Sequence, residues 1–474
     1  MGACMRKNRM KKILVMCVII NILFCAEVES VLAYPAQCSI SVTRREQQET
    51  NWCWAAVSQM IGAHYYGLLT QRQIVINVLG AEYNQGASDA QVRQAIAFAI
   101  NNKYNVTTRN SLSYEKIQKY ISTSKLMGIK MVWNSGGAHA LVLSGYSADG
   151  KVTLVDPAAN AGIERYSYSS LVAGTTIQSG SGRYTKTWTL DLGGMAMKNI
   201  LKIMLMMITI FTIAGSAVYA AEIPVSDQDQ LITSRDWTEI SNLQDEMKKE
   251  EPDATIDYDK ALKVYVDCNL IKLQTADTKK LTSALESANY VWVIPFKMEK
   301  TYGMFTVAKG LPLSEEAKPV LTKAEQEEVK NHAGKWMITE TAEHTVEPYY
   351  DILLEKREAL SDCTRVVLVG SQPGMRQPVA LGMDDETARI WISLGYQYPV
   401  MEKIPETQNV ESGVYSFDSV AEISDTYIED SEVSTGAGVQ SRSSMKYVAG
   451  IGIVLIGSIL ILSVLKKKKI KSED

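Results

Sequence analysis

The sequence predicts an α+β fold in two folded parts, and three observations lead to this prediction. At 474 residues the chain is too long for a single ordinary core. In residues 34–194 helical patterns precede extended runs, whereas residues 221–401 mix both kinds of pattern. Hydrophobic segments lie before, between and after these parts. We therefore expect two separate domains, the first with a helical lobe followed by a lobe of antiparallel sheet.

The chain begins with a pattern that is typical of a secretory signal peptide. A basic stretch between Arg6 and Lys12 is followed by an apolar run at 13–24. The small residues of Val31-Leu32-Ala33 then have the spacing that signal peptidase requires. Residues 1–33 are therefore expected to direct export.

The same pattern recurs at residues 195–220. Lys198 and Lys202 precede an apolar run at 203–214, and Val218-Tyr219-Ala220 follows it. An apolar run of about a dozen residues suits the core of a signal peptide better than a membrane span of ~20 residues. We therefore interpret this segment as a second signal-like sequence.

The last part of the chain predicts a membrane anchor. Residues 402–446 are rich in acidic residues and serine, which predicts a disordered stalk. Residues 447–465 are almost entirely uncharged, and a run of lysines begins at Lys466. This order is typical of a transmembrane helix with a basic cytoplasmic tail, here residues 466–474.

The orientation of these segments presents a conflict. If residues 195–220 crossed the membrane, the lysine-rich tail would lie outside the cell, against the positive-inside rule. The conflict disappears if a second precursor begins at Met195 or Met197 and is joined to the first by a fused reading frame. We therefore interpret the chain as two exported proteins joined together, with an internal membrane span as the alternative. In either case we expect an exported, extracellular or cell-surface location with a single-pass C-terminal anchor.

The first part contains patterns for three helices and four strands. Apolar residues recur at helical spacing after Cys53, and Ser88-Asp89 begins a second such pattern. The predicted helices are 53–64, 88–99 and 113–120, and the predicted strands are 129–133, 138–146, 151–155 and 184–190.

Residues 34–194 supply each group that acyl transfer by a cysteine requires. These are a thiolate, a histidine that relays its proton, a group that orients the histidine, and a donor for the oxyanion. Cys53 opens the first helix, whose dipole favours the thiolate. His139 begins a strand, Asp156 ends the next one, and Gln47 precedes Cys53 closely enough to reach the same pocket.

The segment Gln47-Gln48-Glu49-Thr50-Asn51-Trp52-Cys53-Trp54-Ala55-Ala56 resembles the glutamine and cysteine segment of papain-like cysteine peptidases. It is most similar to the bacterial branch, which includes secreted effector peptidases and double-glycine leader peptidases. Gly137-Ala138-His139 and Val155-Asp156-Pro157 follow in the order of that family. The resemblance covers residues 36–192. It implies a two-lobe papain-like fold, with Cys53, His139 and Asp156 as the catalytic group and Gln47 in the oxyanion hole with the backbone N–H of Cys53.

Several candidates compete for these roles. His64 lies on the same helix as Cys53 but ~16 Å along its axis, too far to act as the base. Gln48 is a rival for Gln47, and Asp156 has the simpler alternative of capping the turn before Pro157. Plant papains have asparagine where this chain has Asp156, and no long propeptide precedes the domain. We assign no chemistry to Cys38.

The second part carries no arrangement of residues that indicates a reaction. Cys268 and Cys363 are candidates for a disulfide after export. The predicted helices are 278–288, 323–330 and 349–360, and the predicted strands are 261–266, 290–295, 366–370 and 389–393.

The sequence therefore predicts a secreted or cell-surface thiol endopeptidase that forms an acyl-enzyme on Cys53. The alternatives are a cell-wall amidase or transglutaminase-like enzyme, and a surface binding or adhesion protein without activity. No spacing indicates a metal or cofactor, and 49 basic against 53 acidic residues without a basic stripe argue against nucleic acid. The expected partners are a protein or peptide substrate, the membrane, and the second part as a surface partner.

Overall fold

The computed structural model describes residues 34–429 except 66, 159–160, 192–222, 274, 300, 345–346, 371, 373–374, 376, 396–400, 402–403 and 405–408. The chain divides into two compact units at residues 37 and 38, and the description below concerns the second. The predicted signal peptide, second signal-like segment, anchor and tail all lie outside the described residues. Among the helices that are described, none has both the length and the apolar character needed to cross a membrane.

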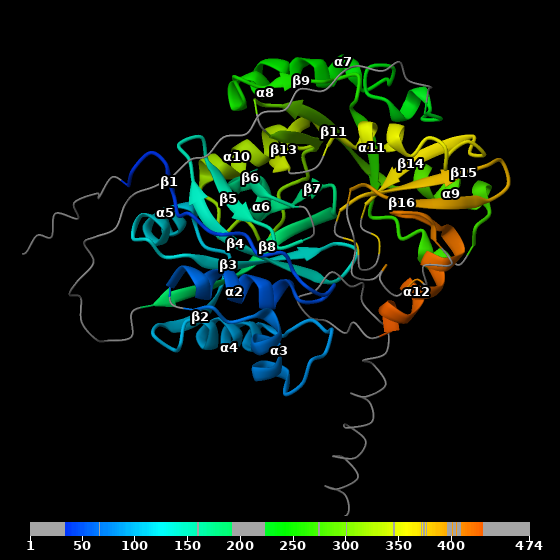
Figure 1. The fold of residues 1–474 in the computed structure, drawn as a ribbon. Coiled ribbons are helices and arrows are strands. Elements are labelled where there is room, and N and C mark those ends of the chain that lie inside the picture. The colour runs from blue at the N-terminus through cyan, green and yellow to red at the C-terminus, as the bar shows by residue number, and fades with distance from the viewer. Residues whose placement is uncertain are drawn as a thin grey trace, which may run out of the picture. The chain divides into compact units, whose positions relative to one another are not determined.

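The first segment of the fold, residues 38–191, places its helices largely before its strands, as predicted. Figure 1 shows α2, α3 and α4 together on one side of strands β3, β4 and β8. Ser88 caps α4 through a capping box with Gln91, and Thr70 caps α3 in the same way with Gln73. The helices are α2 (Cys53–Tyr65), α3 (Gln71–Leu79), α4 (Asp89–Ala99), α5 (Tyr114–Ser122) and α6 (Tyr168–Ala173).

The strands of this segment form an antiparallel sheet in the order β2-β8-β3-β4-β5-β6. Strand β1 also pairs with β4, and β7 forms a hairpin with β8. Strand β4 is buried along its whole length. The strands are β1 (Cys38–Ser39), β2 (Asn105–Asn110), β3 (Met127–Trp133), β4 (Ala138–Tyr146), β5 (Lys151–Val155), β6 (Ile163–Ser167), β7 (Thr175–Ile177) and β8 (Gly180–Asp191).

The core between this sheet and its helices is made of aliphatic side chains and tryptophans. Ile61 of α2, Ile96 of α4 and Val142 of β4 belong to it, and all three are fully buried. Burial of each such side chain contributes about 1.5–3 kcal/mol to stability. Gly62 allows α2 to approach α4, because a Cβ at this position would lie 2.8 Å from the carbonyl oxygen of Ala99. The helix that begins at Cys53 is therefore held firmly against the sheet.

The second segment, residues 223–429, is also a mixture of helices and strands. Its strands follow the order β13-β12-β11-β10-β14-β15-β16-β18-β17, and β9 pairs with the end of β11. Among these described strands, β10 and β14 are the parallel pair. The strands are β9 (Thr255–Ile256), β10 (Leu262–Val266), β11 (Asn289–Lys297), β12 (Tyr302–Lys309), β13 (Trp336–His344), β14 (Arg365–Val369), β15 (Val379–Met383), β16 (Ala388–Ser393), β17 (Asn409–Glu411) and β18 (Val414–Ser416).

Helices of the second segment cover this sheet and build two further cores. Leu281 and Leu285 of α9 pack into one core, and Met247 of α8 packs into the other. The helices are η1 (Asp227–Asp229), α7 (Trp237–Ile240), η2 (Ser241–Leu243), α8 (Gln244–Glu250), η3 (Ile271–Leu273), α9 (Thr278–Glu286), α10 (Lys323–His332), α11 (Tyr349–Glu355) and α12 (Phe417–Glu429).

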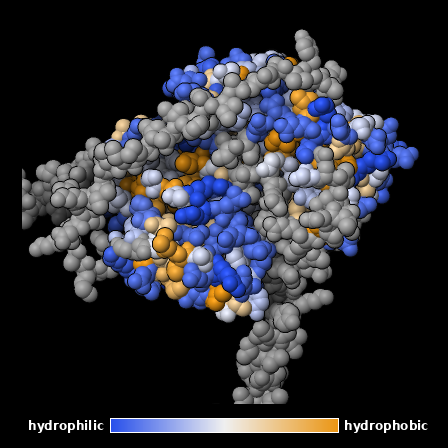
Figure 2. All heavy atoms as spheres, viewed as in Figure 1, coloured by the Kyte–Doolittle hydropathy of each residue, from blue (hydrophilic) through white to orange (hydrophobic). Residues whose placement is uncertain are grey.

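The two segments have separate cores but share a strand pairing. Strand β6 pairs antiparallel with β13, so that Arg165 lies opposite Thr341 and Glu164 lies opposite Ala342. The sheet is therefore continuous from the first segment into the second. On the face drawn in Figure 2 the described residues are mostly hydrophilic, and hydrophobic ones occur in small groups between them.

Two sequence predictions for the second segment are wrong in the described residues. The predicted disordered stalk began at residue 402, but residues 409–429 form β17, β18 and α12. The prediction relied on the acidic average composition of residues 402–446. It overlooked Phe417 and Val420, which are buried in the core. Cys268 and Cys363 are separate thiols. They lie beyond opposite ends of the parallel pair β10 and β14, roughly 30 Å apart along the strands at ~3.3 Å per residue, so they are too distant to bond.

Candidate active site

Cys53 is the first residue of α2, and its side chain is fully buried. The tryptophans on either side of it fix the start of the helix. The indole N–H of Trp52 donates to the carbonyl of Tyr83 at 2.8 Å, and that of Trp54 donates to the carbonyl of Gln85 at 3.1 Å. The predicted nucleophile thus lies at the positive end of a helix dipole, which favours a thiolate.

His139 and Asp156 form a fully buried pair. His139 Nε2 lies 2.7 Å from Asp156 Oδ1, and neither side chain has any exposed surface. His139 is the second residue of β4, and Asp156 directly follows β5. The antiparallel register, in which Val142 lies opposite Val155, brings the two residues to the same end of the strands. Helix α2 packs against β4, so all three predicted catalytic residues belong to adjoining elements.

The hydrogen bond defines the roles of the two imidazole nitrogens. A carboxylate can only accept, so His139 Nε2 must carry the hydrogen that is donated to Asp156. In the neutral ring the proton-accepting nitrogen is then Nδ1. Asp156 Oδ1 also accepts from the backbone N–H of Ala158 at 2.7 Å, which fixes the carboxylate. The pair therefore has the arrangement of an oriented general base.

Arg44, which no sequence pattern singled out, binds the turn that carries Asp156. Its Nε donates to the carbonyl oxygen of Asp156 at 2.7 Å, and its Nη2 donates to the carbonyl oxygen of Ala158. The backbone N–H of Gln47 donates to the carbonyl of Pro157 at 2.7 Å. The segment that leads to Cys53 therefore holds the turn that carries Asp156. No local pattern marks Arg44, because its partners lie more than a hundred positions later in the chain.

Gln47 lies close to this turn, but its side chain is engaged elsewhere. Its Nε2 donates to the carbonyls of Glu49 at 3.0 Å and Thr50 at 2.8 Å. Its Oε1 is buried and has no hydrogen-bond partner among the described residues. The rival Gln48 is exposed, and its backbone N–H donates to Gln71 Oε1 at 2.9 Å. The side-chain amide of Gln47, which is predicted to bind the oxyanion, therefore donates to backbone carbonyls in this structure.

The remaining candidates lie away from this group. His64 is in the last turn of α2, at the opposite end of the helix from Cys53, and burial lowers its pKa. Cys38 lies in β1, and its thiol faces the carbonyl of Ile121 at 3.9 Å. Among the described residues, no three His, Cys, Asp or Glu side chains gather closely enough to hold a metal ion.

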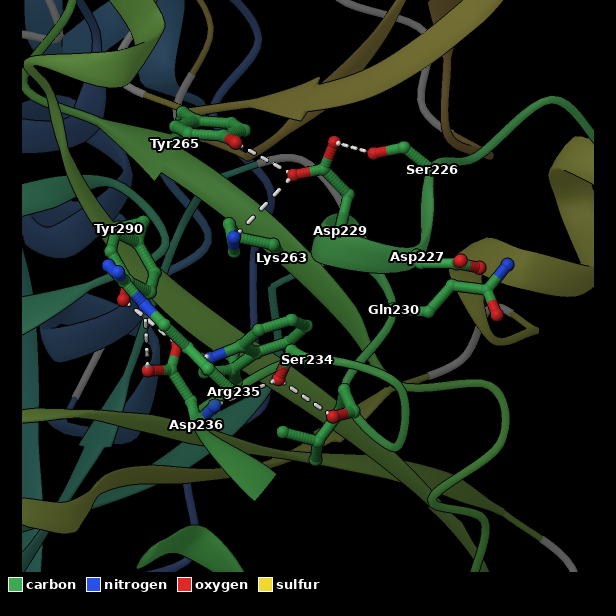
Figure 3. Close-up of polar contacts among 12 residues, drawn as sticks. Ser226, Asp227, Asp229, Gln230, Ser234, Arg235, Asp236, Lys263, Tyr265 and Tyr290 are labelled. Carbon is green, nitrogen blue, oxygen red and sulfur yellow. Dashed lines mark hydrogen bonds and ion pairs between the residues drawn. The ribbon is translucent and has the colours of Figure 1, made fainter. Parts of the chain in front are cut away.

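The second segment contains a buried polar cluster around Asp229, Asp236 and Lys263 (Figure 3). Asp229 Oδ1 accepts from Tyr265 at 2.7 Å and lies 3.6 Å from Lys263 Nζ, while Asp229 Oδ2 lies 3.0 Å from Arg365 Nη2. Burial lowers the pKa of Lys263, whose ammonium also lies 4.8 Å from the centre of the Tyr290 ring. Each charge has a partner within the cluster, which is the arrangement of a structural network.

A cysteine at the start of a helix, next to a strand that carries a buried His–Asp pair, is the arrangement expected of a cysteine peptidase. Residues 36–171 form a papain-like cysteine peptidase domain. They match the family model described as papain-like cysteine protease AvrRpt2. The match contains all four predicted site residues and stops before β7, β8 and the second segment. No curated protein matches the chain.

Proposed function

We propose that the protein is a secreted or cell-surface thiol endopeptidase in which Cys53 is the nucleophile, His139 the base and Asp156 the residue that orients it. The observation that carries the proposal is the fully buried hydrogen bond of 2.7 Å between His139 and Asp156, next to the helix that Cys53 opens. A buried carboxylate both fixes the imidazole ring and stabilises the imidazolium that forms during the reaction.

The reaction follows from the protonation states of these groups. His139 Nδ1 takes the thiol proton of Cys53, and the thiolate attacks the carbonyl carbon of the scissile bond. The imidazolium then gives this proton to the leaving amine as the carbon–nitrogen bond breaks, which leaves a thioester on Cys53. Water attacks the thioester with His139 as its base, and the acid product leaves with the thiol restored.

Gln47 supplies one donor for the oxyanion in this proposal, and the backbone N–H of Cys53 supplies the other. The first N–H groups of a helix have no partner within the helix, so they can stabilise an anion. Gln47 must exchange its bonds to Glu49 and Thr50 for the oxyanion. Because each of those bonds contributes only about 0.5–1.5 kcal/mol, a charged acceptor can compete for the amide.

Export is proposed from the sequence patterns at residues 1–33 and 195–220, and surface attachment from the apolar run at 447–465. Sequencing the N-termini of the mature protein tests these proposals. Termini near Tyr34 and Ala221 support export and two separate precursors. A single chain that retains residues 195–220 supports an internal membrane span.

The activity is tested by digestion of denatured casein with the purified chain, with and without a thiol reductant. Reductant-dependent cleavage that is lost in both Cys53→Ala and His139→Ala supports the proposed roles. His64→Ala is the matched control and keeps its activity, because His64 lies at the far end of α2. A peptide-based epoxide that adds its mass to the wild type but not to Cys53→Ala distinguishes a peptidase from a cell-wall amidase.

A further inference from the structure

Residues 162–183, which follow the proposed catalytic Asp156, contact the second segment along several elements. Strand β6 adds to the edge of β13 through the pairs Arg165 with Thr341 and Glu164 with Ala342. Strand addition supplies backbone hydrogen bonds and fixes the register of two partners. This contact therefore has the form of a specific interface.

A buried polar network crosses the same contact. Tyr166 OH lies 2.6 Å from Glu340 Oε1, and Glu340 Oε2 accepts from Thr306 Oγ1 at 2.7 Å. Gln178 donates to Thr306 Oγ1 at 3.2 Å and accepts from Tyr349 OH at 2.7 Å. All five side chains are buried. If the two segments separated, each of these polar groups would lose its partner. Such a loss costs about 1–3 kcal/mol for a group that stays buried.

The β7–β8 hairpin is held by side chains of the second segment. Ser181 donates its backbone N–H to Asp267 Oδ1 at 2.9 Å and its hydroxyl to Asp267 Oδ2 at 2.6 Å. Thr339 Oγ1 donates to the carbonyl oxygen of Thr176 at 2.9 Å. Both donors of Ser181 and the carbonyl of Thr176 are thus paired with groups from the second segment.

Glycines on both sides allow the two backbones to approach closely. A Cβ at Gly370 would overlap the carbonyl oxygen of Gln178, and a Cβ at Gly162 would overlap the carbonyl oxygen of Glu343. Neither glycine adopts a positive φ, so backbone conformation does not require glycine at these positions. Glycine is required there because the two backbones approach each other closely across the interface.

Charge is distributed unevenly across the contact. Three cations belong to the first segment and their three anionic partners belong to the second, which is the complementarity expected between two binding surfaces. The pairs are Lys151 with Glu250, Arg165 with Glu251, and Arg183 with Glu316.

We infer that residues 223–429 are a binding partner of the peptidase segment, and that the two segments stay bound when the chain is cut between residues 192 and 222. Strand addition, a buried polar network and one-sided charge occur together in this contact, as in interfaces between separate proteins. The inference stands apart from the proposed activity, because it is tested in a chain that lacks Cys53.

The test uses the full chain with Cys53→Ala and a recognition site for a specific protease placed within residues 192–222. After cleavage, the two pieces are followed by size-exclusion chromatography and native mass spectrometry at micromolar and nanomolar concentrations. We expect a single species with the combined mass at micromolar concentration. Pieces that separate at micromolar concentration would overturn the inference.

Variants then locate the interface. Arg165→Glu should weaken the binding of the cut pieces at least tenfold, and the double variant Arg165→Glu, Glu251→Arg should restore it. Gly370→Val should weaken binding further through its overlap with Gln178. The control is Arg389→Glu, which breaks an ion pair with Asp384 within the second segment. If Arg165→Glu and Gly370→Val bind as tightly as the parent chain, the interface is not the one described.

Discussion

Asp156 accepts two hydrogen bonds through one oxygen, from His139 Nε2 and from the backbone N–H of Ala158, both at 2.7 Å. The carboxylate is therefore fixed to its own turn while it orients the imidazole. In the proposed site an aspartate can replace the asparagine of plant papains, because either side chain offers an acceptor oxygen to the ring.

Asp156→Asn should retain part of the activity, whereas Asp156→Ala should lower kcat/KM by about 10²-fold or more. Asparagine keeps an acceptor for His139 but loses the charge that stabilises the imidazolium. The measurement is kcat/KM on a fluorogenic peptide for both variants. Equal losses in the two variants would contradict an orienting role for the acceptor oxygen.

Arg44→Met should lower both stability and turnover. The substitution leaves the carbonyls of Asp156 and Ala158 without their donor, which costs about 1–3 kcal/mol. It also loosens the turn, and a small displacement of a catalytic group can cost up to about 10²-fold in rate. Urea unfolding and kcat/KM measure the two effects. The exposed neighbour Arg45→Met is the control and should change neither.

Asp191 should contribute to stability in a pH-dependent way. Burial opposes its charge, but hydrogen bonds with Thr107, Tyr120 and Arg109 outweigh it and lower the pKa of Asp191. A carboxylate whose folded pKa is depressed stabilises the fold above its unfolded pKa near 3.8, and this contribution disappears as the pH falls through the folded pKa. Asp191→Asn should therefore lower the free energy of unfolding at pH 7 by about 1 kcal/mol.

The measurement for Asp191 is urea unfolding of the wild type and Asp191→Asn at several pH values. The two chains should differ at pH 7 and converge in acid. A difference that stays constant down to pH 2 would mean that the carboxylate acts through packing and not through its charge.

Asp229→Asn should destabilise the second segment by about 3 kcal/mol. Its carboxylate is the shared anion for Arg365 and Lys263, and removal of one charge from a buried group leaves the others uncompensated. Thermal unfolding measures the change. Asp227→Asn is the control, because Asp227 lies two residues away but is exposed (Figure 3).

Glu340→Gln should bind the cut pieces at least as tightly as the parent. The hydroxyl of Tyr166 contacts both Glu164 and Glu340, but it has one hydrogen to donate. A glutamine at position 340 can donate to Tyr166 and still accept from Thr306, so every contact is satisfied. Glu340→Ala removes both contacts and should weaken binding. Native mass spectrometry of the cut chain compares the two, and stronger loss in Glu340→Gln would contradict this hydrogen-bond count.

The residues proposed as catalytic could be singled out in the sequence because each is marked by its neighbours in the chain. Cys53 opens an amphipathic pattern, and His139 and Asp156 bound strands whose limits the apolar runs define. Arg44 could not be predicted, because its role depends on carbonyls from a distant turn. The orientation of the Gln47 side-chain amide could not be predicted either, because it depends on hydrogen bonds to two nearby backbone carbonyls.

The fold of the second segment was harder to predict than its elements. All four predicted strands exist, as β10, β11, β14 and β16, but the parallel pairing of β10 with β14 joins runs separated by about a hundred positions. Helix α3 was missed although its signals are local, namely the capping box of Thr70 with Gln73 and Gly80 at its end. Residues 409–429 were missed because composition was averaged over a long window.

The complete burial of Cys53 has a kinetic consequence. No reagent in solution touches the sulfur of the resting molecule, so alkylation requires the surrounding protein to open first. The rate of alkylation should then level off as the reagent concentration rises. The plateau equals the rate at which the protein around Cys53 opens. A substrate that binds the open form would increase the fraction of molecules in which the thiol is accessible. Access to the thiol is therefore a step that can limit turnover.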